Sequence, residues 1–401
     1  MGRNHDKKLP HAIEYFDYLG TGKYSASEIR KEFYKLGVRM YVSTSDERSY
    51  VYIMGLDESM EQAIELFEHL LHNAKAEQET YDKYVEKELK SRTDRKLRNS
   101  RIFWDGIYNY SRYGKNSPFT NILTSDELKN QDPQELSDIV KNLGNYQHRI
   151  FYYGPKSETE AEKIVTKYHQ IPQTLQPIPE PMKFELLNFD KNRVYVVNYE
   201  MVQIWIMMTT KDQPMNMEIF PQAYMFSEYF GGGLSSIVFQ EIRESRALAY
   251  SAYASYSIPP KKDETHVLFA YIATQPDKMN IATSAMLDLL NNMPKAEIQF
   301  NAAKESLLQR YQTERITKSS IFWNYLRAKD RELDYDIRKD IYKRVKEMSL
   351  NDLEAFFAEH IYDKNYNICI MGDINKIDMK SLEKLGEVTI LNCLLYTSPS
   401  P

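Results

Sequence analysis

One pattern of helix, polar gap and strand occurs twice in this chain of 401 residues. QDPQELSDIVKNL at 131–143 and SLNDLEAFFAEHI at 349–361 each begin with a helix-start signal and continue with apolar residues at helical spacing. Each is followed by a strand-like segment that ends in glycine, HRIFYYG at Gly154 and YNICIMG at Gly372. Corresponding residues of the two copies are 217–218 positions apart, so the sequence indicates a duplicated domain.

A proline-rich segment, IPQTLQPIPEPMKF, lies between the two copies. Proline fixes φ and removes a backbone donor, so this density of prolines excludes a helix and favours an extended linker. We therefore expect a first domain over 1–171, a linker over 172–186 and a second domain over 187–390.

Strands and helices alternate in blocks within each copy. Alternating apolar residues predict strands at 194–199 and 202–208, and a hairpin formed by 38–43 and 50–54. Helical periodicity predicts helices at 58–74, 76–95, 279–293, 297–317 and 338–347. The fold class expected is α+β, with two homologous domains that each layer α-helices on a mixed, mainly antiparallel β-sheet.

Composition excludes several classes of protein. Apolar residues make up 42 %, which allows ordinary cores, and the net charge of −5 argues against a general nucleic-acid binder. No apolar run reaches membrane-spanning length, and Cys369 and Cys393 are too few for a disulfide framework. We expect a soluble protein of a bacterial cytoplasm or periplasm, with neither nucleic acid nor membrane as a partner.

The most informative local segment is GGGLSSIVFQEIRESRALAYSAYASYS at 231–257. A triple glycine leads into an amphipathic helix that carries Arg243; Tyr250 follows seven residues later, at the start of an alternating strand. This order resembles the C-terminal module of the insulinase/pitrilysin-type zinc metallopeptidase family. The resemblance covers about residues 1–390. It implies that Arg243 and Tyr250 bind substrate by hydrogen bonds to the peptide backbone near the scissile carbonyl.

The family's inverted zinc motif, H-x-x-E-H, corresponds to LPHAIEYFDYLGT at 9–21. His11 and Glu14 match the first two positions, but Tyr15 stands where the second histidine ligand belongs. A phenol is a poor zinc ligand near neutrality. The family's third ligand is a glutamate on a later helix; Glu86 and Glu88 lie in that region, but the register points closer to Arg92. We expect His11, Glu14 and Tyr15 to be a degenerate remnant that binds no metal.

Both ends of the chain depart from the family pattern. MGRNHDKKLP corresponds to the residues just before the metal helix, so we expect the first domain to be N-terminally truncated. CLLYTSPSP at the other end has no periodicity, and we expect 391–401 to be a non-native tail on a fragment.

The resemblance implies the non-catalytic half of a zinc metalloendopeptidase, inactive alone, which encloses and positions a peptide substrate. Its expected partner is the catalytic half, in the same polypeptide or in a separate subunit, and that half would hold the zinc. Two alternatives remain open: a non-catalytic scaffold subunit, and a self-sufficient peptidase with a non-standard metal site.

Overall fold

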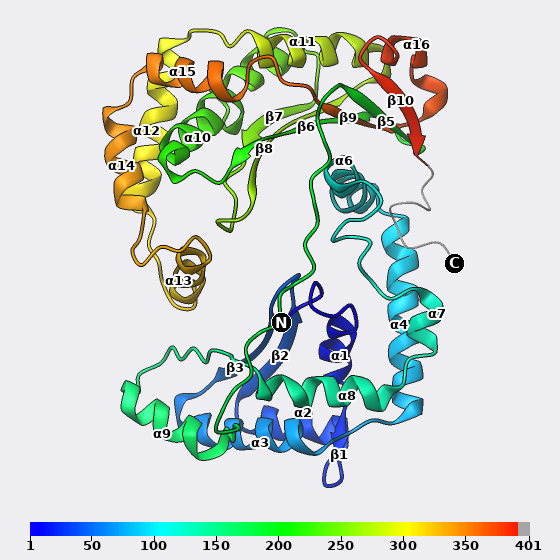
Figure 1. Ribbon diagram of the computed structural model, residues 1–401, viewed down its shortest axis with the longest axis vertical. Helices are drawn as coiled ribbons and strands as arrows, with labels where there is room; N and C mark the ends of the chain where they lie inside the picture. Colours follow the sequence, from blue (N-terminus) through cyan, green and yellow to red (C-terminus); the bar gives the residue numbers. More distant parts are fainter. Residues whose placement is uncertain (392–401) are drawn as a thin grey trace. The chain divides into compact units, whose positions relative to one another are not determined.

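The computed structural model describes residues 1–391 and divides into two compact units (Figure 1). Among the described residues, the first unit comprises 1–102 and 115–185, and the second comprises 103–114 and 186–391. Both units combine helices with strands, which confirms the α+β class. The expected tail at 391–401, including Cys393, lies outside the described residues except for Leu391.

The second unit is built on one six-stranded sheet in the order β10-β5-β9-β6-β8-β7. The pairs β10/β5 and β5/β9 are parallel, whereas β9/β6, β6/β8 and β8/β7 are antiparallel, so this sheet is mixed and mainly antiparallel as expected. The strands are β5 (Arg193–Asn198), β6 (Ile204–Pro214), β7 (Ser251–Tyr256), β8 (Thr265–Thr274), β9 (Asn367–Gly372) and β10 (Glu387–Leu391).

Helices from the rest of this unit supply the apolar side chains of its core. Most of the inward residues come from α10 (Phe220–Phe226), α11 (Met279–Asn291), α12 (Glu297–Thr313), α14 (Arg338–Glu347) and α15 (Leu350–His360). Their apolar side chains recur at helical spacing and pack against the alternate residues of the strands. The helices predicted from periodicity in this unit are therefore present, although α12 ends at Thr313 and not at 317.

A segment remote in sequence also belongs to the second unit. Phe103 packs edge-on against Tyr271 of β8, and Asn367 in β9 donates a hydrogen bond from Nδ2 to the carbonyl of Ser111 at 2.7 Å. This segment, which contains α6 (Tyr108–Tyr113), falls within the range expected for the first domain, 1–171. Nothing in the linear sequence indicates that residues 103–114 pack with the second unit.

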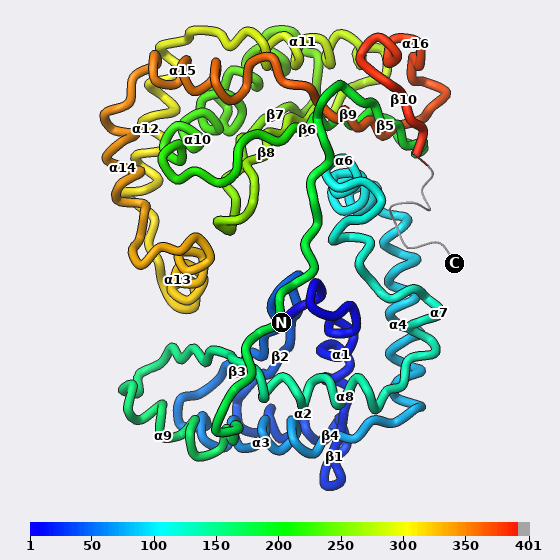
Figure 2. Tube along the Cα trace, in the orientation of Figure 1, coloured from blue at the N-terminus to red at the C-terminus, as the bar shows by residue number. Residues whose placement is uncertain are grey.

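The first unit is mainly helical. Its helices are α1 (Leu9–Phe16), α2 (Ala26–Lys35), α3 (Met60–Asn73), α4 (Gln78–Lys96), the short α5 (Asn99–Arg101), α7 (Ser125–Lys129), α8 (Pro133–Asn142) and α9 (Glu158–Tyr168). The predicted hairpin forms from β2 (Val38–Thr44) and β3 (Ser49–Gly55), entered through Gly37 at a φ of 65° that favours glycine. A second pair, β1 (Gly20–Thr21) with β4 (Ala74–Lys75), lies side by side in the trace of Figure 2.

The prediction of a strand at HRIFYYG, residues 148–154, is wrong. The structure has no strand there. Its counterpart β9 lies between β5 and β6 and pairs with both. Among residues 1–391 no strand lies beside 148–154 to complete a ladder, and an extended segment without partners gains no backbone hydrogen bonds. The first unit thus has two separate two-stranded sheets, and the common fold of the two copies stays a prediction that rests on their helices.

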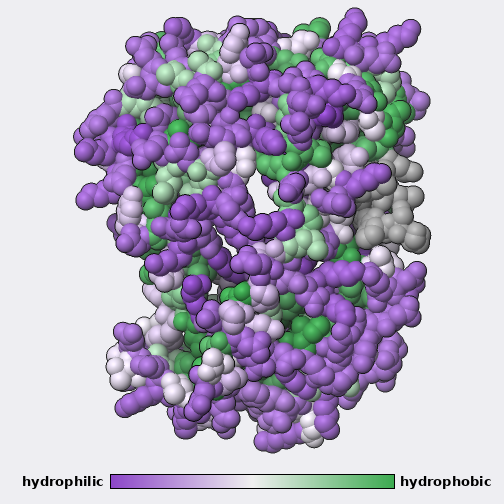
Figure 3. All heavy atoms as spheres, viewed as in Figure 1, coloured by the Kyte–Doolittle hydropathy of each residue, from purple (hydrophilic) through white to green (hydrophobic). Residues whose placement is uncertain are grey.

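The surface of the protein is predominantly polar in the view of Figure 3, with smaller apolar patches between charged residues. Within the described chain, no helix combines the length and the apolar character that crossing a membrane requires. Cys369 is buried in β9, and burial raises the pKa of its thiol to about 12. Cys369 therefore acts as a small apolar residue of the core.

Candidate functional site

The triple glycine allows a helical segment to lie directly on the edge strand of the sheet. Gly231 belongs to the π-helical turn η5 (Ser227–Gly232) beside β7. A Cβ atom on Gly231 would lie 2.2 Å from the backbone nitrogen and oxygen of Ala254. Only glycine permits this approach, so the glycine serves packing and not ligand binding.

The FQEIRES sequence forms a second π-helical segment, η6 (Phe239–Ser245), and a short turn joins it to β7. Ala247 in this turn has a φ of 47°, a backbone conformation that residues other than glycine rarely adopt. The turn is held by the Thr274 hydroxyl, which donates to the carbonyl of Leu248 at 2.6 Å, and by Lys278, which donates to the carbonyl of Ala247 at 2.8 Å. π-Helical turns and strained residues concentrate at functional sites.

This turn brings Arg243 and Tyr250 together. The guanidinium carbon of Arg243 lies 6.0 Å from the centre of the Tyr250 ring and 4.8 Å from that of Phe239. The Arg243 side chain is 43 % exposed and has a loose ion pair of 3.6 Å with Glu244, while Tyr250 is 73 % exposed. Both groups are hydrogen-bond donors, and both are open to a ligand.

In the first unit, α1 and α4 place the three expected remnant residues in a different environment. His11 is buried, and its Nε2 lies 3.3 Å from Nη2 of Arg92. The guanidinium can only donate, so Nε2 accepts and Nδ1 carries the proton. Nδ1 then donates to the Tyr84 hydroxyl at 2.7 Å, and Tyr84 donates to Oε2 of Glu14 at 3.3 Å. A directional chain of hydrogen bonds therefore runs from Arg92 to Glu14.

Arg92 itself is fully engaged. It is buried, donates from Nη1 to the carbonyl of Leu123 at 2.7 Å, and pairs through Nε with Oε1 of Glu88 at 2.9 Å. As the register predicts, Arg92 lies beside His11, while Glu88 accepts from Arg92 and from Arg95. Burial, and secondly the charge of Arg92, lower the pKa of His11 to about 4, so its imidazole is neutral.

The Tyr15 side chain is also bonded within the protein. Its ring is fully buried between Tyr81 and Tyr84. Its hydroxyl donates to the carbonyl of Glu77 at 3.1 Å and accepts from the Glu77 backbone N–H at 3.3 Å. The phenol therefore ties α1 to the start of α4, and burial raises the pKa of Tyr15.

Comparison with known families gives two matches, in separate parts of the chain. Residues 5–102 match the profile described as Insulinase (Peptidase family M16), and residues 147–307 match Peptidase M16 inactive domain. The chain belongs to the insulinase-like M16 family.

Curated relatives in this family extend over most of the chain. An uncharacterized zinc protease of Rickettsia bellii is 22 % identical over 337 residues, which are 80 % of this chain and 79 % of the relative. The uncharacterized zinc protease YmxG of Bacillus subtilis is 20 % identical over 379 residues, 91 % of this chain and 88 % of the relative.

Solved structures show the same fold. The peptidase M16 inactive domain from Pseudomonas fluorescens superposes with a TM-score of 0.69 at 15 % identity, covering 92 % of this chain and 90 % of that chain. The periplasmic protease PqqL from Escherichia coli gives a TM-score of 0.68 at 13 % identity over 93 % of this chain, but this match spans 41 % of PqqL.

Zinc is the metal for which these relatives are named, and the M16 remnant of this chain does not fit it. A catalytic zinc needs three protein ligands and an open position. Nε2 of His11 faces the cationic Arg92, and Tyr15 is committed to the backbone of Glu77. Throughout residues 1–391, no three His, Cys, Asp or Glu side chains gather as a metal site.

Sequence reasoning missed two members of the remnant, Tyr84 and the backbone of Glu77. Tyr84 precedes Glu88 by four residues and Arg92 by eight, so all three share one face of α4. That spacing was a usable signal for Tyr84. The contact with Glu77 involves the main chain alone, and no side-chain pattern encodes it.

Proposed function

We propose that this chain is the non-catalytic half of an insulinase-like peptidase and positions a peptide for a zinc site in a catalytic half. The observation that carries the proposal is the contrast between the exposed Arg243–Tyr250 pair and the remnant, where Arg92 faces His11. The chain keeps groups that can hold a substrate and lacks the ligand set that would cleave it.

The chemistry of the pair suits a peptide carbonyl. A guanidinium and a phenol hydroxyl are both donors, and donors aimed at a carbonyl oxygen stabilise the charge that develops there during hydrolysis. Loss of one such donor costs about 3 kcal/mol in transition-state stabilisation, which lowers the rate on the order of a hundredfold. In this proposal Arg243 and Tyr250 orient the substrate, and hydrolysis takes place at the partner's metal.

Longer structural relatives support a partner half. PqqL and the ferredoxin protease FusC each contain this fold in 41 % of their length, and FusC was solved in complex with Arabidopsis ferredoxin. In the proposed assembly the second half is a catalytic M16 unit, either in the same polypeptide or as a separate subunit. Closure of the two halves around a peptide would exclude water and bring the donors to the carbonyl.

The test mixes this chain with a matching catalytic M16 half and follows cleavage of a fluorogenic peptide. Cleavage is expected only in the mixture, and Arg243→Ala or Tyr250→Phe should lower turnover about a hundredfold without preventing association. Arg246→Ala and Tyr34→Phe are matched controls, because these side chains are exposed and lie outside the pair.

Two results would replace the proposal. Wild-type turnover by both Arg243→Ala and Tyr250→Phe, with association intact, would make the chain a scaffold subunit. Cleavage by the purified chain alone, dependent on bound metal, would make it a self-sufficient peptidase.

A further inference from the structure

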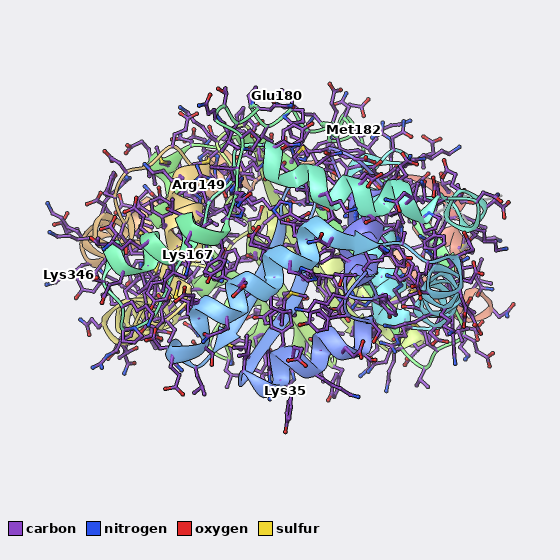
Figure 4. All side chains as sticks on the ribbon, turned by 90° about the horizontal axis from the view of Figure 1, so that it is seen from below. Lys35, Arg149, Lys167, Glu180, Met182 and Lys346 are labelled. Atoms are coloured by element: carbon purple, nitrogen blue, oxygen red, sulfur yellow. The ribbon has the colours of Figure 1, made fainter. Side chains whose placement is uncertain are left out.

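Two histidines of the first unit that are not among the remnant residues face each other. His148 lies after the short helix η3 (Leu143–Asn145), and His169 caps the C-terminal end of α9. Their Nε2 atoms are 2.9 Å apart, and the rings meet edge to face. Figure 4 labels Arg149 and Lys167, which are near neighbours of the two histidines in sequence.

The other nitrogen of each ring identifies the tautomer. Nδ1 of His148 is 2.7 Å from the carbonyl oxygen of Tyr146, and Nδ1 of His169 is 2.7 Å from Oε1 of Glu68. A carbonyl and a carboxylate can only accept, so both Nδ1 atoms carry the proton and donate it. Each neutral imidazole consequently presents the lone pair of its Nε2 to the other.

Two lone pairs at this distance repel unless a positive ion lies between them. We propose that His148 and His169 form a binding site for a divalent transition-metal ion of the class that prefers imidazole: Zn²⁺, Ni²⁺ or Cu²⁺. The neutral Nε2 atom is a common ligand for such ions. The competing occupant is a single proton shared by the two rings.

The surroundings have the form of a second ligand shell. Ligating histidines usually donate their other N–H to a carboxylate or a backbone carbonyl, and this pair has one of each. Glu68 is buried in α3 and orients His169, while its second oxygen, Oε2, lies 3.2 Å from Nε2 of His72. The negative charge of Glu68 would make His169 a stronger ligand. Lys167, which precedes His169 by two residues, is paired with Glu61 at 2.5 Å.

The geometry requires only a small adjustment. Zinc–nitrogen bonds of about 2.0–2.1 Å in a tetrahedral site put two ligand nitrogens roughly 3.3 Å apart, a few tenths more than observed here. His148 is exposed on a segment without regular secondary structure, which can supply this opening. The His169 side chain is 15 % exposed, so water can reach the ion. Because the described residues provide no third ligand, water would complete the coordination.

The experiment titrates Zn²⁺, Ni²⁺ and Cu²⁺ into the metal-free chain by calorimetry in a weakly coordinating buffer. One ion should bind per chain, with Cu²⁺ tightest, and the Cu²⁺ electron paramagnetic resonance spectrum should show splitting from two imidazole nitrogens. Mg²⁺, which prefers oxygen ligands, should not bind. His148→Ala and His169→Ala should each abolish the site, and Glu68→Gln should weaken it about 10–100-fold.

His72→Ala is the matched control, because it removes another imidazole that contacts Glu68 without touching the pair. Unchanged binding in this variant, together with loss in His148→Ala and His169→Ala, supports the site. If none of the three ions binds to the unaltered chain, the proposal is overturned, and a proton shared by the two rings is the occupant instead. Binding that survives loss of both histidines would overturn it as well. The site does not depend on the proposed peptidase role, since no step of the assay involves a peptide.

Discussion

The remnant around His11 and the pair Arg243–Tyr250 differ in how their polar groups are used. In the remnant, the ring nitrogens of His11 and the hydroxyl of Tyr15 are bonded inside the protein, to Arg92, to Tyr84 and to the backbone of Glu77. In the pair, both donors are exposed to solvent, Tyr250 more so than Arg243. A binding site keeps donors open for its ligand, whereas a converted site spends them on stability.

The largest expected effect comes from Arg92→Ala. This change removes a buried cation and leaves Glu88, the Leu123 carbonyl and His11 without it. Breaking a buried ion pair from one side costs about 3–5 kcal/mol in the free energy of unfolding, which urea denaturation would measure. Lys83→Ala is the control, since its exposed pair with Glu79 contributes about 0.3–0.5 kcal/mol. An equally small loss for Arg92→Ala would show that the remnant stabilises nothing.

The pH dependence of stability gives the next effect. The pKa of His11 falls from 6.5 to about 4 on folding, so between these values the unfolded chain binds more protons. The contribution of His11 is complete above pH 6.5 and is lost as the pH falls toward 4, by about 3 kcal/mol. His11→Gln should remove this component, and urea unfolding of both proteins across the range would detect it. Parallel pH profiles would refute a neutral, buried His11.

A smaller loss is expected for Tyr15→Phe. The hydroxyl satisfies both backbone groups of Glu77, and its removal should cost about 2 kcal/mol. Tyr34→Phe, at a tyrosine that is 84 % exposed, should leave the unfolding free energy unchanged. If the two variants unfold alike, the contact with Glu77 carries no energy.

The smallest effect on stability is expected at the exposed pair. Arg243→Ala and Tyr250→Phe should each change the free energy of unfolding by less than about 0.5 kcal/mol, as is usual for exposed side chains. A loss of several kcal/mol in a denaturation experiment would show that the pair is structural, and would weaken its assignment to substrate.

Much of this architecture was predictable from periodicity. The hairpin of β2 and β3 and the strands β5 to β7 follow from local alternation, and the helices α3, α4, α8, α11, α12, α14 and α15 follow from apolar spacing. The failure at 148–154 has a definite cause: strand propensity is local, but a strand requires partners that the local sequence does not reveal. The transfer of 103–114 to the second unit is likewise a long-range effect.

The residues of the candidate sites also divide into those that the sequence predicted and those that depend on long-range contacts. Tyr15 could be predicted from its place four residues after His11 on α1, and Arg92 from the register of the family's third ligand on a later helix. Contacts with the backbone of Glu77 and the facing of His148 and His169 depend on loops, whose paths no periodicity encodes.

The most direct test of the central claim, that the remnant holds no zinc, is elemental analysis of the dialysed His148→Ala/His169→Ala double variant. This background removes the second proposed site, so any zinc reports on the remnant. The account predicts far less than one zinc per chain, with only a modest gain on adding Tyr15→His, because Arg92 still occupies the place of a third ligand. One tightly bound zinc per chain that disappears with His11→Ala would contradict it.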